Sequence, residues 1–287
     1  MTPTPHVATT IPGIRSIVAD ATAKGERVAL VPTMGALHDG HLALVRRARE
    51  LGDLVVVSIF VNPLQFGPNE DFDRYPRTLE TDLGALTGIA DVVFAPAVDE
   101  MYPDGPTQTR VTGGDVASQF EGASRPGHFD GMLTVVAKLL NIVRPNVVLF
   151  GQKDAQQVFL VRQMVSDLDI RSSVEAVPTV RENDGLALSS RNAYLDGDAR
   201  REAVTLSSAL NDVASAAAHG ADEALAAGLA RVQASAAVKL DYLAIVDPHT
   251  FRSVDERYRG PAIALIAARV GGTRLIDNAS VVIGAAG

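Results

Sequence analysis

The chain contains no cysteine. This absence excludes disulfides, thiolate zinc sites, iron–sulfur clusters and a cysteine nucleophile, and it is compatible with a reducing cytosol. Long hydrophobic runs are also missing, because the longest apolar stretch, 54–61, contains Ser58 and is far shorter than the ~20 residues of a membrane span. Residues 1–10 have neither the basic start nor the apolar segment of a signal peptide. We therefore expect a cytoplasmic protein with no membrane partner.

Basic residues are in the minority. The sequence has 26 Lys and Arg against 34 Asp and Glu, which gives a net charge of −8. Such a balance provides no general attraction to nucleic acid, so we expect no nucleic-acid partner. A length of 287 residues, 47% of them hydrophobic, suits one or two domains of roughly 150 residues, which can bury a core without disulfides.

Short β-branched runs alternate with helical patterns over the first 180 residues. A proline after Arg144 marks the end of the clearest helix, since proline disfavours helical geometry in the residue before it. The order β-α-β-α predicts a Rossmann-like open parallel sheet with right-handed crossovers. The patterns predict strands at 27–33, 54–61, 91–95 and 146–150, and helices from residue 41, over 132–143 and over 154–168.

The pattern changes after about residue 180. The alanine-rich stretch 198–237 predicts two helices, broken near Gly220. Strand-like patterns follow at 240–246, 262–270 and 274–284, with a Gly-rich turn at 271–272. The sequence therefore predicts an α/β protein with a Rossmann-like domain over 1–180 and a smaller α+β C-terminal domain over 181–287.

The most informative motif directly follows the first predicted strand, where His38 and His41 form a His-x-Gly-His element. The start of a helix has free N–H groups and a positive dipole end, both of which attract phosphate. Two imidazoles at this place can donate hydrogen bonds to phosphate oxygens, and open α/β sheets bind ligands at the carboxyl ends of their strands. The motif indicates a nucleotide site. The alternatives are a Gly-rich loop with two surface histidines, or two histidines of a metal site.

Further polar residues follow other predicted strands. Lys153 lies where a strand meets a helix and could act as a point charge on phosphate, with Asp154 beside it as a helix cap. The polar loop 188–192 could close over a triphosphate and stabilise developing charge. A surface lysine and an ordinary turn are the alternatives.

Neutral amides and one acid complete the candidate set. Asn62, Gln65 and Gln157 suit a small hydroxylated or carboxylated substrate, although Asn62 precedes a proline and could simply begin a turn. Asp82 offers an oxygen ligand for magnesium, as hard cations prefer, or it is a surface carboxylate.

Taken together, several segments resemble the pantothenate synthetase family, whose members are pantoate–β-alanine ligases of the nucleotidyltransferase superfamily, related to class I aminoacyl-tRNA synthetases. The most specific motifs, in chain order, are P-T-M-G-A-L-H-x-G-H, F-V-N-P-x-Q-F and S-S-R-N. The similarity runs from about residue 10 to the end and is loose in the last third. The segments that carry it are 31–48, 58–66, 75–78, 127–143, 151–157 and 178–192.

The resemblance implies a two-step ligation. The carboxylate of (R)-pantoate attacks the α-phosphorus of ATP, and the amine of β-alanine then attacks the resulting pantoyl adenylate, giving pantothenate, AMP and pyrophosphate. It also implies Mg²⁺ as cofactor and a homodimer. The domain over 1–180 would bind the nucleotide and pantoate, and the C-terminal domain over 181–287 would close over the active site. Thr81 precedes Asp82 where some members have a second Asp, so Asp82 could ligate the metal or the ATP phosphates could hold it.

The resemblance assigns roles to particular residues, and His41 would also be a proton donor. The catalytic residues would be His38, His41, Lys153, Ser189, Ser190 and Arg191. Pantoate and β-alanine would contact Met34, Asn62, Gln65 and Gln157, with Arg125 and His128 as weaker candidates. ATP would contact Met34, Gly35, Ala36, Leu37, His38, Asp39, Gly40, His41, Gly151, Gln152, Lys153, Asp154, Val180, Leu188, Ser189, Ser190 and Arg191.

Two other functions compete with this interpretation. A nucleotidyltransferase that makes a CDP- or ADP-linked product would use the first motif but not the second and third. A non-catalytic nucleotide-binding regulator would not need competent histidine, lysine and arginine residues at all these positions. A tRNA synthetase is disfavoured by the short, acidic chain, which has no room for an anticodon-binding domain.

Overall fold

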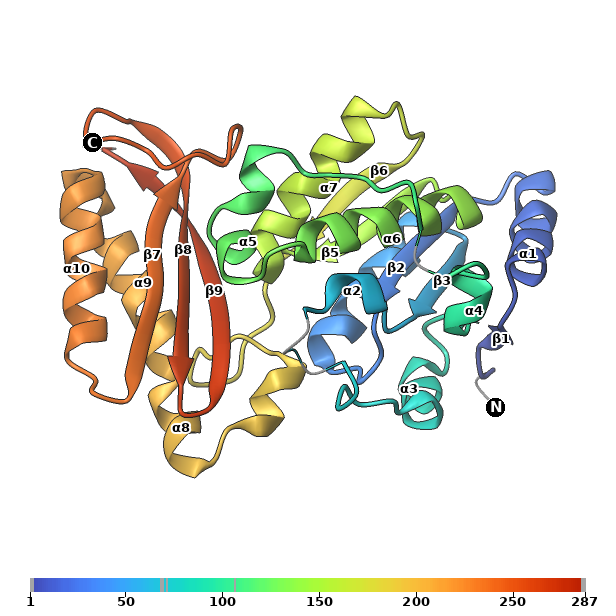
Figure 1. Cartoon of the computed structure of the whole chain (residues 1–287), viewed down its shortest axis with the longest axis horizontal. Coiled ribbons are helices and arrows are strands. Elements are labelled where there is room, and N and C mark those ends of the chain that lie inside the picture. Colours follow the sequence, from blue (N-terminus) through green and yellow to red (C-terminus); the bar gives the residue numbers. More distant parts are fainter. Residues whose placement is uncertain (1–2, 68–69, 71, 106, 285–287) are drawn as a thin grey trace. The chain divides into compact units, whose positions relative to one another are not determined.

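The computed structural model describes residues 3–67, 70, 72–105 and 107–284 (Figure 1). The chain forms two compact units. The first unit consists of Met1–Gly151 and Leu160–Val177, and the second unit of Gln152–Phe159 and Pro178–Gly287. The chain therefore enters the second unit twice. Residues 152–159 belong to the second unit, and the chain returns to it after Val177. Independent domains over 1–180 and 181–287 stay a prediction.

The first unit is built on a six-stranded sheet in which every neighbouring pair is parallel, so the predicted open parallel sheet is confirmed. The strand order is β1-β4-β3-β2-β5-β6. The strands are β1 (His6–Ala8), β2 (Val28–Thr33), β3 (Leu54–Ile59), β4 (Val92–Phe94), β5 (Val147–Gly151) and β6 (Ser173–Val177).

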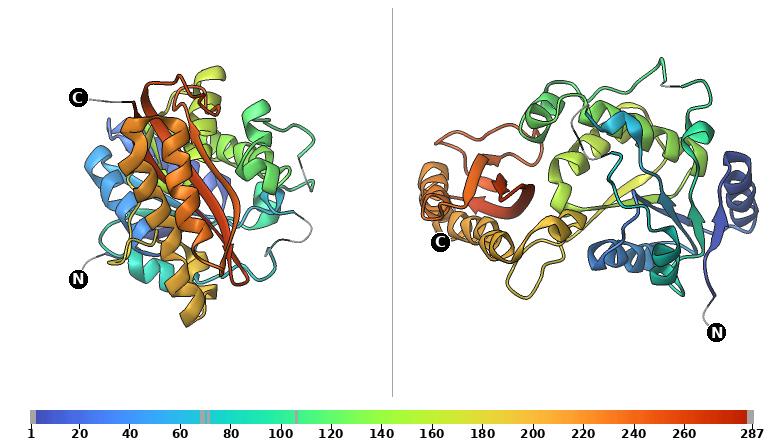
Figure 2. Two further views of the ribbon diagram at one scale, coloured as in Figure 1. Left: turned by 90° about the vertical axis from the view of Figure 1, so that its left-hand side faces the viewer. Right: turned by 60° about the horizontal axis from the view of Figure 1, so that its bottom comes forward.

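Helices cover both faces of this sheet (Figure 2, right). On one face, Val55 and Val57 of β3 pack with Val45 of α2 (Asp39–Leu51) and Leu86 of α3 (Leu79–Leu86). On the other, α1 (Ile11–Ala23) and α6 (His128–Val143) pack against each other and β2. Successive side chains of a strand point to opposite faces of the sheet. Because the apolar residues of β2 and β3 are continuous, these strands are buried on both faces of the sheet.

Most predicted elements of the first unit are present, with two differences. The sequence patterns did not reveal β1 and α1, which precede the first predicted strand, nor did they reveal α3 and β6. The helix expected over 154–168 begins with a 3-10 turn, η3 (Gln152–Asp154), and continues as α7 (Ala155–Asp167). Arg144 ends α6 in the left-handed conformation, directly before the proline. Shorter elements are η1 (Pro63–Gln65), α4 (Val98–Met101), η2 (Asp115–Ser118) and α5 (Glu121–Ser124).

The second unit contains an antiparallel sheet of β7 (Val238–Val246), β8 (Gly260–Val270) and β9 (Thr273–Ile283). Helices α9 (Val204–Ala216) and α10 (Ala221–Gln233) lie against one face of it (Figure 2, left). Small residues allow close packing, because a Cβ on Gly228 would come within 2.6 Å of a Val213 methyl carbon. The predicted α+β order is confirmed. The remaining elements are η4 (Ser190–Tyr194), α8 (Gly197–Glu202) and η5 (Ala217–His219).

The expectation of only two helices over 198–237 was wrong, since α8 is separate from α9. Asp196 caps α8 by accepting a hydrogen bond from the Ala199 N–H. Ala203 ends α8 in a helical conformation and leads straight into α9. Because alanine favours helix throughout, hydrophobic periodicity gives no signal at such a junction.

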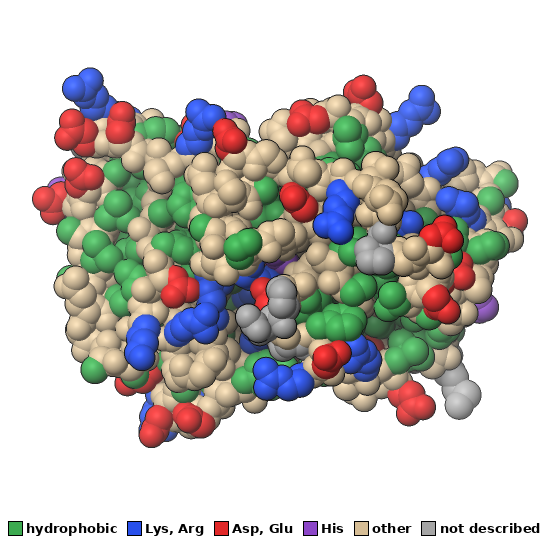
Figure 3. Space-filling view, in the orientation of Figure 1, with side chains coloured by type: hydrophobic (Ala, Val, Ile, Leu, Met, Phe, Trp, Pro, Cys, Tyr) green, Lys and Arg blue, Asp and Glu red, His purple; other side chains and the backbone are tan. Residues whose placement is uncertain are grey.

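Two surface features bear on possible partners. Within residues 3–67, 72–105 and 107–284, no helix combines the length and apolar character that crossing a bilayer requires. On the face shown in Figure 3, Lys and Arg side chains are interspersed with Asp and Glu side chains. Interspersed charges of both signs do not form the continuous basic surface typical of nucleic-acid binding.

Candidate active site

The strand order places a switch point at β2. Its neighbour β3 lies on one side and β5 on the other, so the chain leaves the carboxyl ends of β2 and β5 at adjacent places. Open α/β sheets bind ligands at such a point. The predicted nucleotide loop follows β2. Gly151, the last residue of β5, precedes Gln152–Asp154, which we call the Lys153 segment.

The loop after β2 is held by a buried carboxylate. Gly35 and Ala36 have positive φ values of 83° and 51°, which turn the backbone sharply. Asp82, only 2% exposed, accepts hydrogen bonds from the N–H groups of Ala36 (3.1 Å) and Leu37 (2.9 Å). The Thr78 hydroxyl donates to the same carboxylate at 3.3 Å. Asp82 therefore fixes the conformation of the predicted ATP loop.

His38 and His41 cap the first turn of α2 with their side chains. Nδ1 of His38 accepts from the Gly40 N–H at 3.1 Å, and Nδ1 of His41 accepts from the His38 N–H at 3.4 Å. The ring centroids are 4.1 Å apart. A nitrogen that accepts has no proton, so the proton of each neutral ring is on Nε2. In this tautomer, Nε2 of each ring carries a proton of the kind that can be donated to a phosphate oxygen.

The predicted substrate residue Gln65 has a fixed amide orientation. Its Oε1 accepts from Nδ2 of Asn62 at 3.2 Å, and its Nε2 donates weakly to the Met34 sulfur at 3.1 Å. Asn62 is 1% exposed, donates also to the Gly131 carbonyl at 3.0 Å and accepts from the Tyr102 hydroxyl at 2.8 Å. Burial raises the pKa of Tyr102, which keeps its hydroxyl protonated. Asn62 therefore orients Gln65 so that Nε2–H is its outward donor.

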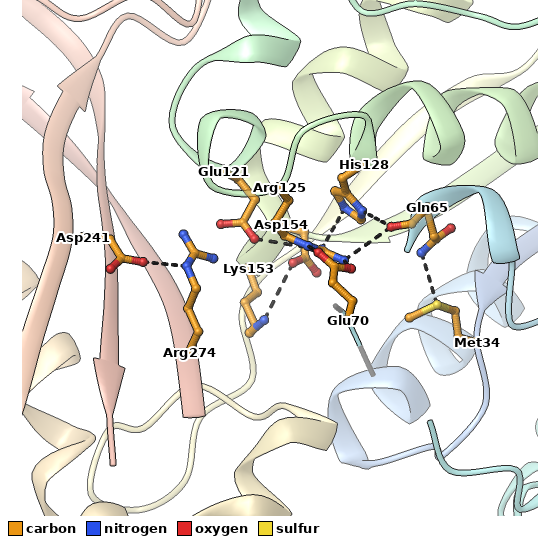
Figure 4. A network of polar contacts seen from close by, with 10 residues as sticks. All are labelled: Met34, Gln65, Glu70, Glu121, Arg125, His128, Lys153, Asp154, Asp241 and Arg274. Carbon is orange, nitrogen blue, oxygen red and sulfur yellow. Dashed lines mark hydrogen bonds and ion pairs between the residues drawn. The ribbon is translucent and has the colours of Figure 1, made fainter. Parts of the chain in front are cut away.

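A charged network holds the backbone of Gln65 (Figure 4). Nδ1 of His128 donates to the Gln65 carbonyl at 2.9 Å, and its Nε2 lies 3.1 Å from a guanidinium nitrogen of Arg125. Arg125 also binds Glu70 through two hydrogen bonds of 2.8 and 2.6 Å. Glu121 completes the network, 3.9 Å from Arg125.

The titration of this network follows from burial and charge. Burial, and secondly the charge of Arg125, lower the pKa of His128 from 6.5 to about 4, so the ring is neutral. Burial alone would raise the pKa of Glu70, but hydrogen bonds and charge from Arg125 outweigh it and hold that pKa below its ordinary value. Sequence reasoning missed Glu70, because a single glutamate in a polar segment carries no signal of this contact.

In the second unit, the Lys153 segment is attached to the last strand. Nδ2 of Asn278 in β9 donates to the carbonyls of Gln152 (2.9 Å) and Lys153 (2.8 Å). The ammonium group of Lys153 lies 3.7 Å from the Asp154 carboxylate (Figure 4). Gln157, half-buried, follows on α7. Sequence analysis did not identify Asn278, which lies 125 residues away along the chain.

The other predicted residues of the second unit lie on a short hairpin and the turn after it. The Leu188 N–H donates to the Val180 carbonyl at 3.0 Å, which places these two residues side by side. Ser189 is the N-cap of η4, and its hydroxyl accepts a hydrogen bond from the Arg191 N–H at 3.3 Å. The hairpin therefore leads directly into the polar loop of Ser189, Ser190 and Arg191.

The predicted site residues thus form two sets, one in each unit. The structure brings together Met34–His41, Asn62, Gln65, Asp82, Arg125 and His128 in the first unit. It brings together Gln152–Asp154 with β9, and Val180 with Leu188–Arg191, in the second. That both sets act on one ligand stays a prediction.

The residues that the structure describes offer no complete set of protein ligands for a magnesium ion. Among the residues that the structure describes, no group of three His, Asp or Glu side chains could hold a metal ion. Both oxygens of Asp82 accept hydrogen bonds from the protein. Asp82 therefore suits the role of holding the loop.

Comparison with known proteins identifies the family. The family model for pantoate-beta-alanine ligase matches residues 6–280. The chain belongs to this family. A pantothenate synthetase from Leifsonia xyli subsp. xyli (strain CTCB07) is 64% identical over 266 residues, which cover 92% of this chain and 93% of that protein. One from Nocardioides sp. (strain ATCC BAA-499 / JS614) is 54% identical over 297 residues, covering 100% and 88%.

Solved structures of pantoate–β-alanine ligases share the fold. Pantothenate synthetase from Thermus thermophilus has a TM-score of 0.90 and 47% identity, covering 96% of this chain and 98% of that chain. The enzyme from Francisella tularensis, complexed with beta-gamma ATP and beta-alanine, has a TM-score of 0.79 and 36% identity, covering 99% of both chains. The expected family and fold are confirmed, and the chain is an ATP-dependent ligase of pantoate and β-alanine.

Proposed function

We propose that this ligase works in two steps through a pantoyl adenylate. In the first step, the pantoate carboxylate forms a bond to the α-phosphorus of ATP, and the bond from that phosphorus to the pyrophosphate oxygen breaks. In the second step, the amine of β-alanine bonds to the acyl carbon, AMP leaves, and the amine loses a proton. The complex of the Francisella tularensis enzyme supports ATP and β-alanine as ligands.

The observation that carries this proposal is that Nδ1 of both histidines at the start of α2 accepts a backbone N–H. Both neutral rings therefore carry their proton on Nε2. Donors fixed before the substrate binds need no reorganisation when charge develops on the phosphates. His38 and His41 would therefore stabilise the pentavalent transition state at the α-phosphorus.

Gln65 would place the pantoate carboxylate for attack. Its amide is held from the side chain by Asn62 and from the backbone by His128. An Nε2–H donor of fixed direction can bind a hydroxyl or carboxylate oxygen of pantoate. Asn62, 1% exposed, would act through Gln65, while Gln157 would make a second contact to the substrate. Positioning of this kind removes much of the entropic cost of the reaction.

Lys153 and Arg191 would stabilise the pyrophosphate that leaves, assisted by the hydroxyls of Ser189 and Ser190. Adenosine would lie against Gly151, Asp154, Val180 and Leu188, largely through backbone atoms. The contacts of Lys153 and of the Val180–Leu188 hairpin within the second unit support these assignments. Magnesium would be held by the ATP phosphates. A homodimer follows from family resemblance, and light scattering that shows a monomer at micromolar concentration would refute it.

The experiment that tests the mechanism is a single-turnover reaction with ATP and pantoate, without β-alanine. Pyrophosphate should be released, and pantoyl adenylate should be detected by mass spectrometry, whereas AMP should form quickly only when β-alanine is added. Omission of pantoate is the control, because a nucleotidyltransferase of another class would not depend on it. Lys153→Ala should slow adenylate formation by a factor of about 100 or more. A Lys153→Ala rate near that of the wild type would refute its assigned role.

A further inference from the structure

A cluster of polar side chains is buried on β9, between residues of the hydrophobic core. Asp277 and Asn278 are 4% and 5% exposed, while Leu275 and Val281 of the same strand belong to the core of the second unit. Burial of polar groups costs free energy unless each one has a hydrogen-bond partner. Core packing alone therefore gives no reason for an Asp-Asn pair at this place.

Arg181 neutralises the buried carboxylate of Asp277. The two guanidinium nitrogens of Arg181 donate to the two oxygens of Asp277 at 2.6 and 2.9 Å. The N–H of Asn278 also donates to Asp277, at 2.8 Å, and Arg181 donates to the Asn278 carbonyl at 3.2 Å. These bonds fix the backbone of Asn278 on both sides of its Cα, so the direction of its side chain is set.

The side-chain amide nitrogen of Asn278 donates hydrogen bonds to the Lys153 segment. Nδ2 carries two hydrogens, and it donates to the carbonyls of two successive residues, Gln152 at 2.9 Å and Lys153 at 2.8 Å. These residues form η3, the turn between β5 and α7. Asn278 thus holds the peptide groups from which the Lys153 side chain projects.

The same cluster also holds the hairpin that precedes the polar loop. Arg181 lies on that hairpin, where it donates to the Gly185 carbonyl at 3.0 Å. Its neighbour Val180 pairs with Leu188, which directly precedes Ser189. One buried cluster therefore connects the two segments of the second unit to which phosphate contacts are assigned.

We propose that Asn278, fixed by the Arg181–Asp277 pair, is a positioning residue that sets the place of Lys153 for formation of the pantoyl adenylate. The inference rests on the proposed role of Lys153. A displacement of about 1 Å in such a group can reduce a rate about 100-fold. The C-terminal strand would then contribute to the chemistry without contacting substrate.

The first test is the single-turnover rate of adenylate formation in Asn278→Ala and Asn278→Asp. Alanine removes both donors, and aspartate keeps the size but directs a carboxylate oxygen at two carbonyls. We expect the single-turnover rate of adenylate formation to be about 100-fold lower in each variant. Val213→Ala is the control, because Val213 is a fully buried core residue of the same unit, 0% exposed, and carries no assigned role. It should lose thermal stability and keep its rate.

The decisive test is the double variant Lys153→Ala/Asn278→Ala. If Asn278 acts through Lys153, the double variant should be no slower than Lys153→Ala alone, whereas independent effects would multiply. Two results would overturn the proposal. One is that the Asn278 variants form adenylate at the same rate as Val213→Ala, and the other is that the double variant is about 100-fold slower than Lys153→Ala. A fast Lys153→Ala would overturn both this proposal and the role of Lys153, and is thus distinguishable from a failure of Asn278 alone.

Discussion

The two nitrogens of each histidine at the start of α2 serve different purposes. Nδ1 of His38 stabilises the helix by accepting the Gly40 N–H, and Nδ1 of His41 accepts the His38 N–H. In the proposed function, Nε2–H of each ring would donate to phosphate. Substitutions that imitate one nitrogen and not the other can separate the structural role from the chemical one.

We expect His38→Asn to retain stability and lose activity, because the asparagine oxygen can take the place of Nδ1 as helix cap but cannot reach the place of Nε2. His38→Ala should lose both, with about 1 kcal/mol less stability. His41→Gln, whose amide nitrogen reaches the position of Nε2, should be more active than His41→Asn. Adenylate formation should fall 10²–10³-fold when an Nε2 donor is lost, by roughly 2.7–4 kcal/mol. Equal activity of His38→Asn and the wild type would contradict this division.

The hydroxyl of Tyr102 allows a second test at the residue scale. Tyr102→Phe removes the 2.8 Å donor to Oδ1 of the buried Asn62, which then keeps only the Leu64 N–H at 3.3 Å, so the amides of Asn62 and Gln65 are held less firmly. We expect the KM for pantoate to rise several-fold and stability to fall by about 1–3 kcal/mol. Tyr258→Phe is the matched control, since its hydroxyl donates to the Pro261 carbonyl in the second unit. An unchanged KM in Tyr102→Phe would contradict the orientation of Gln65.

Residue types could be predicted from the sequence better than residue roles. The histidine pair, Gln65 and Lys153 follow from motifs, since their chemistry is visible in the residue type. The partners that orient them could not be predicted. Tyr102 lies 40 residues from Asn62, and Asn278 lies 125 residues from Lys153, so only the folded chain brings these groups together.

At the scale of elements, the nucleotide loop depends on α3 as well as on β2 and α2. Asp82 projects from the first turn of α3 and accepts the N–H groups of Ala36 and Leu37. An acid in the first turn of a helix is also favoured by the helix dipole. The loop conformation is therefore set by contacts from three elements.

We expect Asp82→Asn to reduce kcat/KM for ATP by 10- to 100-fold, because an amide nitrogen facing the N–H of Ala36 or Leu37 would repel it and release the loop, at about 1–3 kcal/mol. The measurement is ATP dependence at several Mg²⁺ concentrations. Additional Mg²⁺ should not restore activity if Asp82 acts on the loop. Recovery at high Mg²⁺ would instead identify Asp82 as a metal ligand.

The network around Arg125 predicts a pH dependence of stability. The folded pKa of His128, about 4, lies below its ordinary 6.5. Between these values the unfolded chain binds more protons, so the free energy of unfolding falls as the pH falls from 6.5 to 4, by about 3 kcal/mol. His128→Asn keeps a donor near the position of Nδ1 and does not titrate. Chemical denaturation across pH 4–7 should show a shallower decline for His128→Asn, and equal declines would exclude His128 as the source.

Element prediction succeeded for β2 to β5 and for α6, and it missed β1, α1, α3 and β6. The β-branched runs of β2, β3 and β5 and the periodic helix α6 were predicted, because each buries many apolar residues. β1 has only three residues and no periodicity to detect. The start of α8 is fixed by the Asp196 cap, and its junction with α9 at Ala203 has no side-chain cap that the sequence could reveal.

For the whole molecule, the predicted phosphate-binding residues are divided between two units. His38 and His41 belong to the first unit, and Lys153 and Arg191 to the second. The chain crosses between the units at Gly151, Phe159 and Val177. A ligand that contacts both sets would reduce the relative motion of the units. Sequence analysis alone could suggest this division from composition but could not predict that residues 152–159 group with the second unit.

The absence of cysteine allows the predicted closure of the C-terminal domain to be tested. The double variant Lys24→Cys/Arg257→Cys has one introduced thiol at an exposed position in each unit. A spin label on each thiol would report the distance between these positions. We expect ATP and pantoate together to narrow the distance distribution, because the proposed adenylate would contact both sets of predicted residues. Labels on Lys24→Cys/Glu80→Cys, both in the first unit, should give a distribution that does not respond to substrates. An identical distribution for the first pair with and without substrates would contradict closure of the C-terminal domain over the active site.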